Sequence, residues 1–150
     1  MDPSEIRERI GRFRILTIGR ANTGKTTILQ RVCNTRDNPE IFNSAGNKVG
    51  ITLLRGEHDI ENEMVFRSNP GFVFHDSRGF EAGGESEFEK VKAFIAGRSK
   101  EVKLKDQLHA IWYCIPMDEA SRSFTASEIK FFSQCDTGSS ELSHPTFVDV

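Results

Sequence analysis

Residues 13–34 constrain the fold of this chain more than any other stretch, because three kinds of segment follow one another there without a gap. The apolar, β-prone run "FRILTI" at 13–18 predicts a buried strand. It leads into the glycine-rich loop "GRANTGKTT" at 19–27. The overlapping segment "KTTILQRVCN" predicts a helix with Ile28, Leu29 and Val32 on one face. A strand, a glycine loop and a helix in this order are typical of α/β proteins.

The loop fits the pattern G-x-x-x-x-G-K-[ST]. Glycines at its two fixed positions allow a close backbone approach that a Cβ would block. Successive N–H groups can then form a nest for an anion at the positive end of the helix. Lys25 can reach the β- and γ-phosphates, and the Thr26 hydroxyl can bind Mg²⁺. The residues expected to hold a phosphate chain are Gly19, Asn22, Thr23, Gly24, Lys25, Thr26 and Thr27. The alternative is a chance match in an ordinary glycine turn. The loop does not choose between ATP and GTP.

Further along the chain, β-prone and helical patterns alternate. Residues 34–50 are polar and predict a long loop. The predicted strands are 60–67, 72–76 and 108–117, and the predicted helices are 86–100 and 126–135. Capping boxes of Ser86 with Glu89 and of Thr125 with Glu128 are expected to begin the two helices. The order predicts an open α/β sheet with helices on both faces.

A second chemical signal is "FVFHDSRGFE" at 72–81. Asp76 ends a strand that should lie beside the first one, where a carboxylate can hold the water shell of Mg²⁺. Gly79 completes D-x-x-G, and the N–H of such a glycine can sense a γ-phosphate. A simple turn at the end of the strand is the alternative, since D-x-x-G is a common pattern.

With these motifs in order, the chain resembles the translation-factor-related class of P-loop GTPases. In that class a threonine of a mobile loop closes on Mg²⁺ and the γ-phosphate, and the resemblance assigns this role to Thr52 in "VGITLL". An ordinary residue at the start of a strand is the alternative for Thr52. More narrowly, "RGEHDIENEMVF", "NPGFVFHDSRGFEAGG" and "LHAIWYCI" are similar to G-domain proteins abundant in mushroom-forming fungi, distantly similar to the septin and AIG/Toc families.

The resemblance covers about residues 12–138 and implies a P-loop NTPase three-layer sandwich with a mostly parallel sheet. It divides the chain into an extension (1–12), a partial G domain (13–138) and a divergent tail (139–150). The implied function is GTP binding with Mg²⁺-dependent hydrolysis. The implied metal ligands are Thr26, Thr52 and Asp76. GTP or another nucleoside triphosphate is the expected ligand, and a protein partner or a nucleotide-dependent dimer is also implied.

Two departures from the family pattern stand out. Ras-like members place a water-orienting Gln after the D-x-x-G glycine, where this chain has Phe80. Hydrolysis would then need another group, with His75, Arg78 and Glu81 nearby, or a partner. The guanine-reading N/T-K-x-D motif does not occur in the sequence. The carboxy-terminal part of the G domain, including its closing strand, is therefore expected to be missing.

The missing base motif leaves two alternatives open, a non-catalytic nucleotide-binding interaction module and an inert truncated fragment. A P-loop kinase is a third, with "AGRSK" as its only hint. The net charge of -2 predicts no nucleic-acid partner. No apolar run approaches the ~20 residues of a membrane span. Three scattered cysteines without a C-x-x-C pair predict buried thiols and a cytoplasmic protein.

Overall fold

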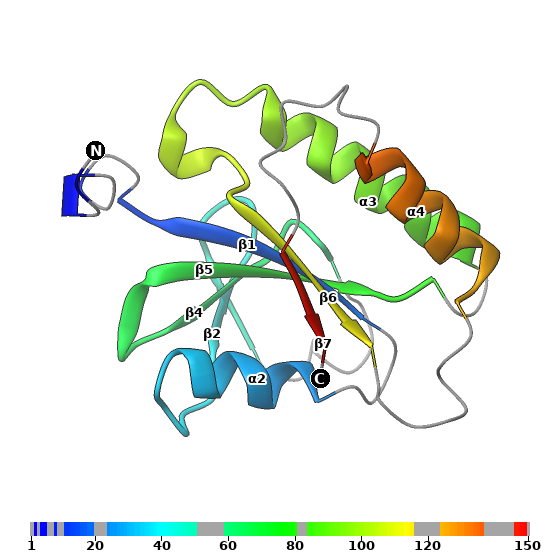
Figure 1. Cartoon of the computed structure of the whole chain (residues 1–150). Helices are drawn as coiled ribbons and strands as arrows, with labels where there is room; N and C mark the ends of the chain where they lie inside the picture. The colour runs from blue at the N-terminus through cyan, green and yellow to red at the C-terminus, as the bar shows by residue number, and fades with distance from the viewer. Residues whose placement is uncertain are drawn as a thin grey trace.

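The computed structural model describes residues 2, 4–5, 8, 11–19, 24–50, 59–80, 84–115, 124–136 and 146–149. Within them, seven strands form one sheet in the order β3-β2-β4-β5-β1-β6-β7 (Figure 1). The strands are β1 (Phe13–Gly19), β2 (Glu40–Phe42), β3 (Lys48–Val49), β4 (Glu63–Phe66), β5 (Asn69–Arg78), β6 (Ala110–Ile115) and β7 (Thr146–Asp149). The predicted α/β class is confirmed at this level.

The sheet is mixed, so the prediction of a mostly parallel sheet is wrong. β1 pairs in parallel with β5 and β6, and β6 pairs in parallel with β7. The β2–β3, β2–β4 and β4–β5 pairs are antiparallel. The β2–β3 and β4–β5 pairs have short connections, and a parallel pair would need a crossover of a dozen or more residues. β5 begins at Asn69, three residues before the predicted strand 72–76.

Helices cover both faces of this sheet. The helices are α2 (Lys25–Val32), α3 (Gly84–Ser99) and α4 (Ala126–Asp136), with a short 3-10 turn at Leu104–Asp106. Figure 1 shows α2 on one face, and α3 and α4 side by side on the other. No helix among the described residues is both long enough and apolar enough to cross a membrane.

Only one of the two predicted capping boxes exists. At the start of α4, the Thr125 N–H donates to Glu128 Oε1 at 2.9 Å, and the Glu128 N–H donates to Thr125 Oγ1 at 3.2 Å. Glu128 is fully buried and also accepts a 2.7 Å bond from the Tyr113 hydroxyl. Helix α3 begins at Gly84, so Ser86 lies inside the helix, and the box with Glu89 is a wrong prediction.

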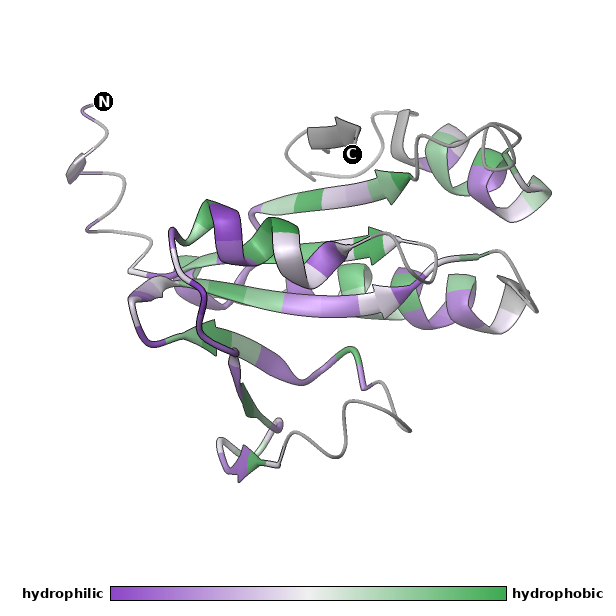
Figure 2. Ribbon diagram, turned by 90° about the horizontal axis from the view of Figure 1, so that it is seen from below, coloured by the Kyte–Doolittle hydropathy of each residue, from purple (hydrophilic) through white to green (hydrophobic). Residues whose placement is uncertain are grey.

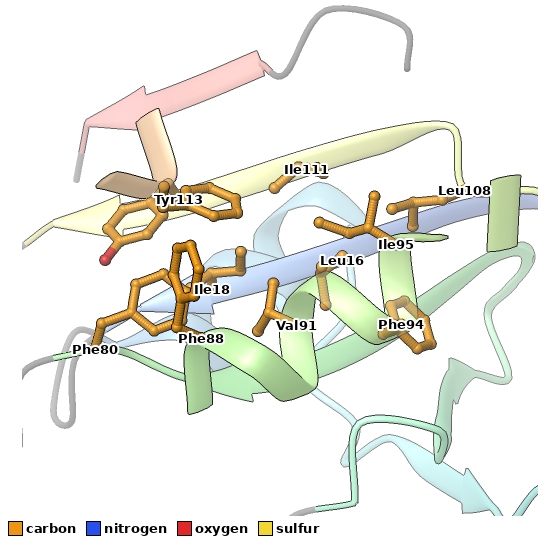
Figure 3. Packing of buried hydrophobic residues seen from close by; sticks show 11 residues of the cluster. Leu16, Ile18, Phe80, Phe88, Val91, Phe94, Ile95, Leu108, Ile111 and Tyr113 are labelled. Atoms are coloured by element: carbon orange, nitrogen blue, oxygen red, sulfur yellow. The ribbon is translucent and has the colours of Figure 1, made fainter. Parts of the chain in front are cut away.

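Two hydrophobic clusters hold the layers together. The cluster under α3 and α4 contains Phe88, Val91 and Ile95, which lie three and four residues apart on α3 (Figure 3). The cluster on the opposite face joins Leu29 of α2 to Ile15 and Phe74 of the sheet. Hydrophobic residues are concentrated along the central strands (Figure 2). Because successive side chains of a strand point to opposite faces, β1 supplies both clusters.

Residues 34–50 do not form the long loop predicted from their composition. They contain the β2–β3 hairpin, whose turn is organised by one side chain. Asn43 Oδ1 accepts bonds from the N–H groups of Ala45 at 3.1 Å and Asn47 at 2.9 Å. Gly46 has φ 81, which favours glycine. Polar side chains bonding to nearby backbone can therefore build a hairpin tip as well as a loop.

The expectation that the closing strand is missing is also wrong. β7 pairs in parallel with β6, with Trp112 opposite Thr146 and Ile115 opposite Asp149. This strand lies within residues 139–150, the segment predicted as a divergent tail. Without β7, the edge of β6 would present a row of unpaired backbone groups. A short β-prone segment can pair with such an edge without any family motif.

Candidate phosphate-binding site

The candidate site lies where β1 and β5 end and α2 begins. β1 ends at Gly19, and the described chain resumes at Gly24, which precedes the first residue of α2. Gly24 has φ 71, in the left-handed region that glycine adopts without strain. The predicted strand and helix are thus found on either side of the loop, of which residues 20–23 lie outside the described residues. Asn22 and Thr23 lie outside the described residues.

Gly19 is required by packing as well as by its place in the motif. A Cβ at this position would lie 2.9 Å from Cys114 Cβ and 3.0 Å from the Cys114 carbonyl oxygen on β6. It would also lie 3.1 Å from Cδ of Lys25. A residue larger than glycine would clash with β6 and with Lys25, which the site needs. Cys114 and Cys33 are buried, as predicted for the thiols, and burial raises the pKa of both.

Lys25 joins the ends of the two central strands. Its Nζ donates to the carbonyl oxygens of Gly19 and Ser77, each at 3.0 Å, and lies 3.2 Å from Asp76 Oδ1. The lysine side chain is 16% exposed and the aspartate side chain 20%, so the pair is largely shielded but reachable from solvent. A positive charge is therefore held at the carboxyl ends of the parallel strands, where α/β sheets bind ligands.

Asp76 stands beside the first strand, as predicted. β1 and β5 pair with Thr17 opposite Asp76. The Thr17 hydroxyl lies 3.0 Å from the His75 carbonyl oxygen and 3.3 Å from Asp76 Oδ1. The prediction from sequence missed Thr17. Its only signal was one hydroxyl residue within the apolar run "FRILTI".

The other predicted residues have different positions. Thr26 and Thr27 lie exposed in the first turn of α2, and Gly79 is buried just after the end of β5. Thr52 lies outside the described residues. A threonine hydroxyl and a carboxylate suit Mg²⁺, a hard cation that keeps several waters and takes few protein ligands. The Thr26 hydroxyl and the Asp76 carboxylate are both oxygen ligands of the kind that Mg²⁺ takes.

Phe80 does not face the candidate site. Its ring is 2% exposed and points into the cluster below α3 and α4, as Figure 3 shows. The ring centroids of Phe88 and Phe131 lie 5.7 Å and 5.5 Å from that of Phe80. The Thr125 hydroxyl lies 3.4 Å from the Phe80 carbonyl oxygen. The residue after the D-x-x-G glycine is thus part of the core.

His75 has a structural environment. Arg14 Nη1, which can only donate, lies 2.8 Å from His75 Nε2, so Nε2 accepts and Nδ1 carries the proton donated to the Ile60 carbonyl oxygen at 2.7 Å. Arg14 Nη1 also lies 3.1 Å from Glu63 Oε2. Burial, helped by the charges of Arg14 and Arg98, lowers the pKa of His75 to about 3. A group this hard to protonate in the folded chain is a poor general base for hydrolysis near neutral pH.

Of the other two groups considered for hydrolysis, Arg78 is exposed at the end of β5. Glu81 lies outside the described residues. Among the residues that the structure describes, no group of three or more His, Cys, Asp and Glu could hold a metal ion.

A cavity of about 530 Å³ opens near the site, on the α3 side of β5. It is lined by the end of β5 and by residues of α3 that include Glu87, Lys90 and Phe94. Lys90 lies 3.4 Å from Glu87, and Arg98 lies 3.4 Å from Glu61 at the rim. The end of β5 that lines the cavity includes Asp76 and Arg78, so the cavity adjoins the Lys25 end of the site.

No protein-family model matches this sequence, and no curated protein matches it significantly. The resemblance to G domains therefore stays a prediction from the sequence motifs.

Proposed function

We propose that this chain binds a nucleoside triphosphate together with Mg²⁺, in the manner of a G domain. The observation that carries the proposal is the position of Lys25. Its ammonium lies at the ends of two parallel strands and at the start of a helix, within 3.2 Å of the Asp76 carboxylate. A triphosphate placed there would meet a lysine, the positive end of a helix and a partly exposed carboxylate suited to Mg²⁺.

The proposed roles of the residues follow from their charge and chemistry. Lys25 and the loop N–H groups would hold the phosphates, while Thr26 and Asp76 would hold the metal, with Thr52 added by the resemblance. Bound Mg²⁺ would neutralise the charge that develops on the β- and γ-phosphates. GTP is the nucleotide that the resemblance implies, although the sequence lacks the motif by which that family reads guanine.

Hydrolysis of the γ-phosphate would be slow without a partner. Positioning and charge stabilisation supply most of the catalysis in this reaction class, and Lys25 can contribute both. The group that orients water in Ras-like proteins is replaced by Phe80, a buried ring with no donor or acceptor. The burial of Phe80 favours the second candidate, a module that binds nucleotide and signals to a partner without rapid turnover.

The inert-fragment alternative is less favoured. The described strands join into a single sheet with a hydrophobic cluster on each face, and such burial is the main stabilising contribution in a domain. β7 covers the outer edge of β6.

Parallel calorimetric titrations with GTP and ATP, each with Mg²⁺ and with EDTA, test the proposal. The expected result is saturable binding that is stronger with Mg²⁺. Binding with phosphate release at a measurable rate supports a GTPase, and binding without release supports the interaction module. The absence of binding to either nucleotide by a folded chain would refute the proposal.

A further inference from the structure

We propose that Thr17 is a positioning residue that aims the Asp76 carboxylate at the magnesium site, an inference that depends on the function proposed above. Thr17 belongs to none of the motifs that carry the resemblance. It lies in the middle of β1, opposite Asp76 in the parallel pair of β1 and β5.

The Thr17 hydroxyl is a buried polar group with apolar neighbours. The side chain is 1% exposed, and its neighbours Leu16 and Ile18 are fully buried and apolar. Burying a hydroxyl costs free energy unless it is hydrogen-bonded, and valine would fill the same space without that cost. The hydrogen bonds from the hydroxyl to its acceptors therefore have to offset the cost of burying it.

One of the two acceptors belongs to Asp76, the carboxylate proposed to hold the metal. The Thr17 hydroxyl has one proton and two acceptors, the His75 carbonyl oxygen at 3.0 Å and Asp76 Oδ1 at 3.3 Å. Lys25 Nζ approaches the same Oδ1 at 3.2 Å. When Lys25 turns to a phosphate, its hold on Oδ1 weakens, and the Thr17 hydroxyl remains on that oxygen. It can then keep the carboxylate in one orientation while the Mg²⁺ shell assembles.

Residues that orient metal-binding groups matter for affinity. Loss of such a contact commonly costs 10–100-fold in metal affinity. We therefore expect Thr17→Val to raise the Mg²⁺ concentration that gives half of the magnesium-dependent gain in GTP affinity by about tenfold. GTP affinity in EDTA should not change, because the two hydrogen bonds of the Thr17 hydroxyl in the described structure go to the His75 carbonyl oxygen and to Asp76, and neither goes to Lys25.

The experiment is a calorimetric titration of GTP into the full chain over a series of Mg²⁺ concentrations, EDTA included. Thr17→Ser keeps the hydroxyl and should restore the parental magnesium midpoint. Thr125→Val is the matched control, because it removes a hydrogen-bonded threonine hydroxyl at the start of α4. It should lower thermal stability and leave the midpoint unchanged. If Thr17→Val does not fold, Thr17→Cys replaces it, with a small side chain that donates only weakly.

The outcomes separate the two proposals. A folded Thr17→Val or Thr17→Cys chain with the parental midpoint overturns the role of Thr17 and leaves the proposed function standing. An equal rise in Thr17→Ser also overturns it, because the effect would then come from packing. A parental chain whose GTP binding ignores EDTA refutes the proposed function and, with it, this inference.

Discussion

Replacing Lys25 by alanine should weaken triphosphate binding strongly and destabilise the fold only slightly. Lys25 Nζ bonds to two carbonyl oxygens at 3.0 Å and lies 3.2 Å from Asp76 Oδ1. Hydrogen bonds that involve a charged group contribute about 1.5–3 kcal/mol each. The Lys25 side chain is partly exposed, so its removal lets water reach the freed oxygens. We therefore expect a total loss well below the sum for two such bonds, about 1.5 kcal/mol in the free energy of unfolding.

A loss of that size lowers Tm by only about 3–6 °C for a chain of this length. The effect on binding should be much larger, because the ammonium is the only charge that the motif directs at the phosphates. We expect triphosphate affinity to fall at least a hundredfold, which is ~2.7 kcal/mol. Circular dichroism and thermal unfolding measure the first effect, and calorimetry with GTP and Mg²⁺ measures the second.

Lys48→Ala is the matched control for this experiment. It removes the same charge from β3, where the Lys48 side chain is 59% exposed and lies 3.5 Å from Glu40 Oε1. Its triphosphate affinity should equal that of the parent. The reasoning is refuted if Lys25→Ala folds and binds as tightly as the parent. It is equally refuted if both variants lose affinity alike, because net charge alone would then explain the effect.

Three further predictions follow from the site and its surroundings. Thr26→Ala and Asp76→Ala should each weaken GTP binding in Mg²⁺ and change it little in EDTA; a parental affinity that is insensitive to EDTA contradicts this assignment. The affinities for GTP and ATP should differ by less than about tenfold, ~1.4 kcal/mol, and a GTP preference of about a thousandfold in a competition titration would show that another residue reads guanine. Because the pKa of His75 is lower in the folded than in the unfolded chain, its contribution to stability is intact above about pH 6.5 and is lost as the pH falls toward 3. The free energy of unfolding should therefore fall by about 2 kcal/mol between about pH 7 and pH 5, and a His75→Asn chain with the same pH dependence in urea unfolding would contradict the role of His75.

Local pattern was sufficient for several elements of this protein. The run "FRILTI" predicted β1, which is buried on both faces. The segment 25–34 predicted the helix α2, but of its expected apolar face Leu29 is buried and Val32 is exposed. The Thr125–Glu128 box predicted the start of α4, because its bonds span only three residues. Asp76 at the end of an apolar run predicted a carboxylate beside β1.

The pairing of strands that are distant in the chain could not be predicted from local sequence patterns. The β2–β3 hairpin and the antiparallel half of the sheet depend on which edges meet, and residues 34–50 carry the composition of a loop. β7 forms because the edge of β6 accepts it. Strand pairing is decided by contacts between distant segments, so hydrophobic periodicity within one segment does not report it.

By itself the sequence determined which residues could carry phosphate chemistry, because the loop and D-x-x-G motifs are set by short spacings around Lys25 and Asp76. Only the tertiary structure decided how these residues are held. It placed the Thr17 hydroxyl by the Asp76 carboxylate, packed Gly19 against Cys114, and turned Phe80 into the core. Each of these contacts joins positions far apart in the chain, and each depends on strand register and side-chain direction. Both are properties of the packed sheet, since a shift of one residue in register would turn Thr17 to the opposite face.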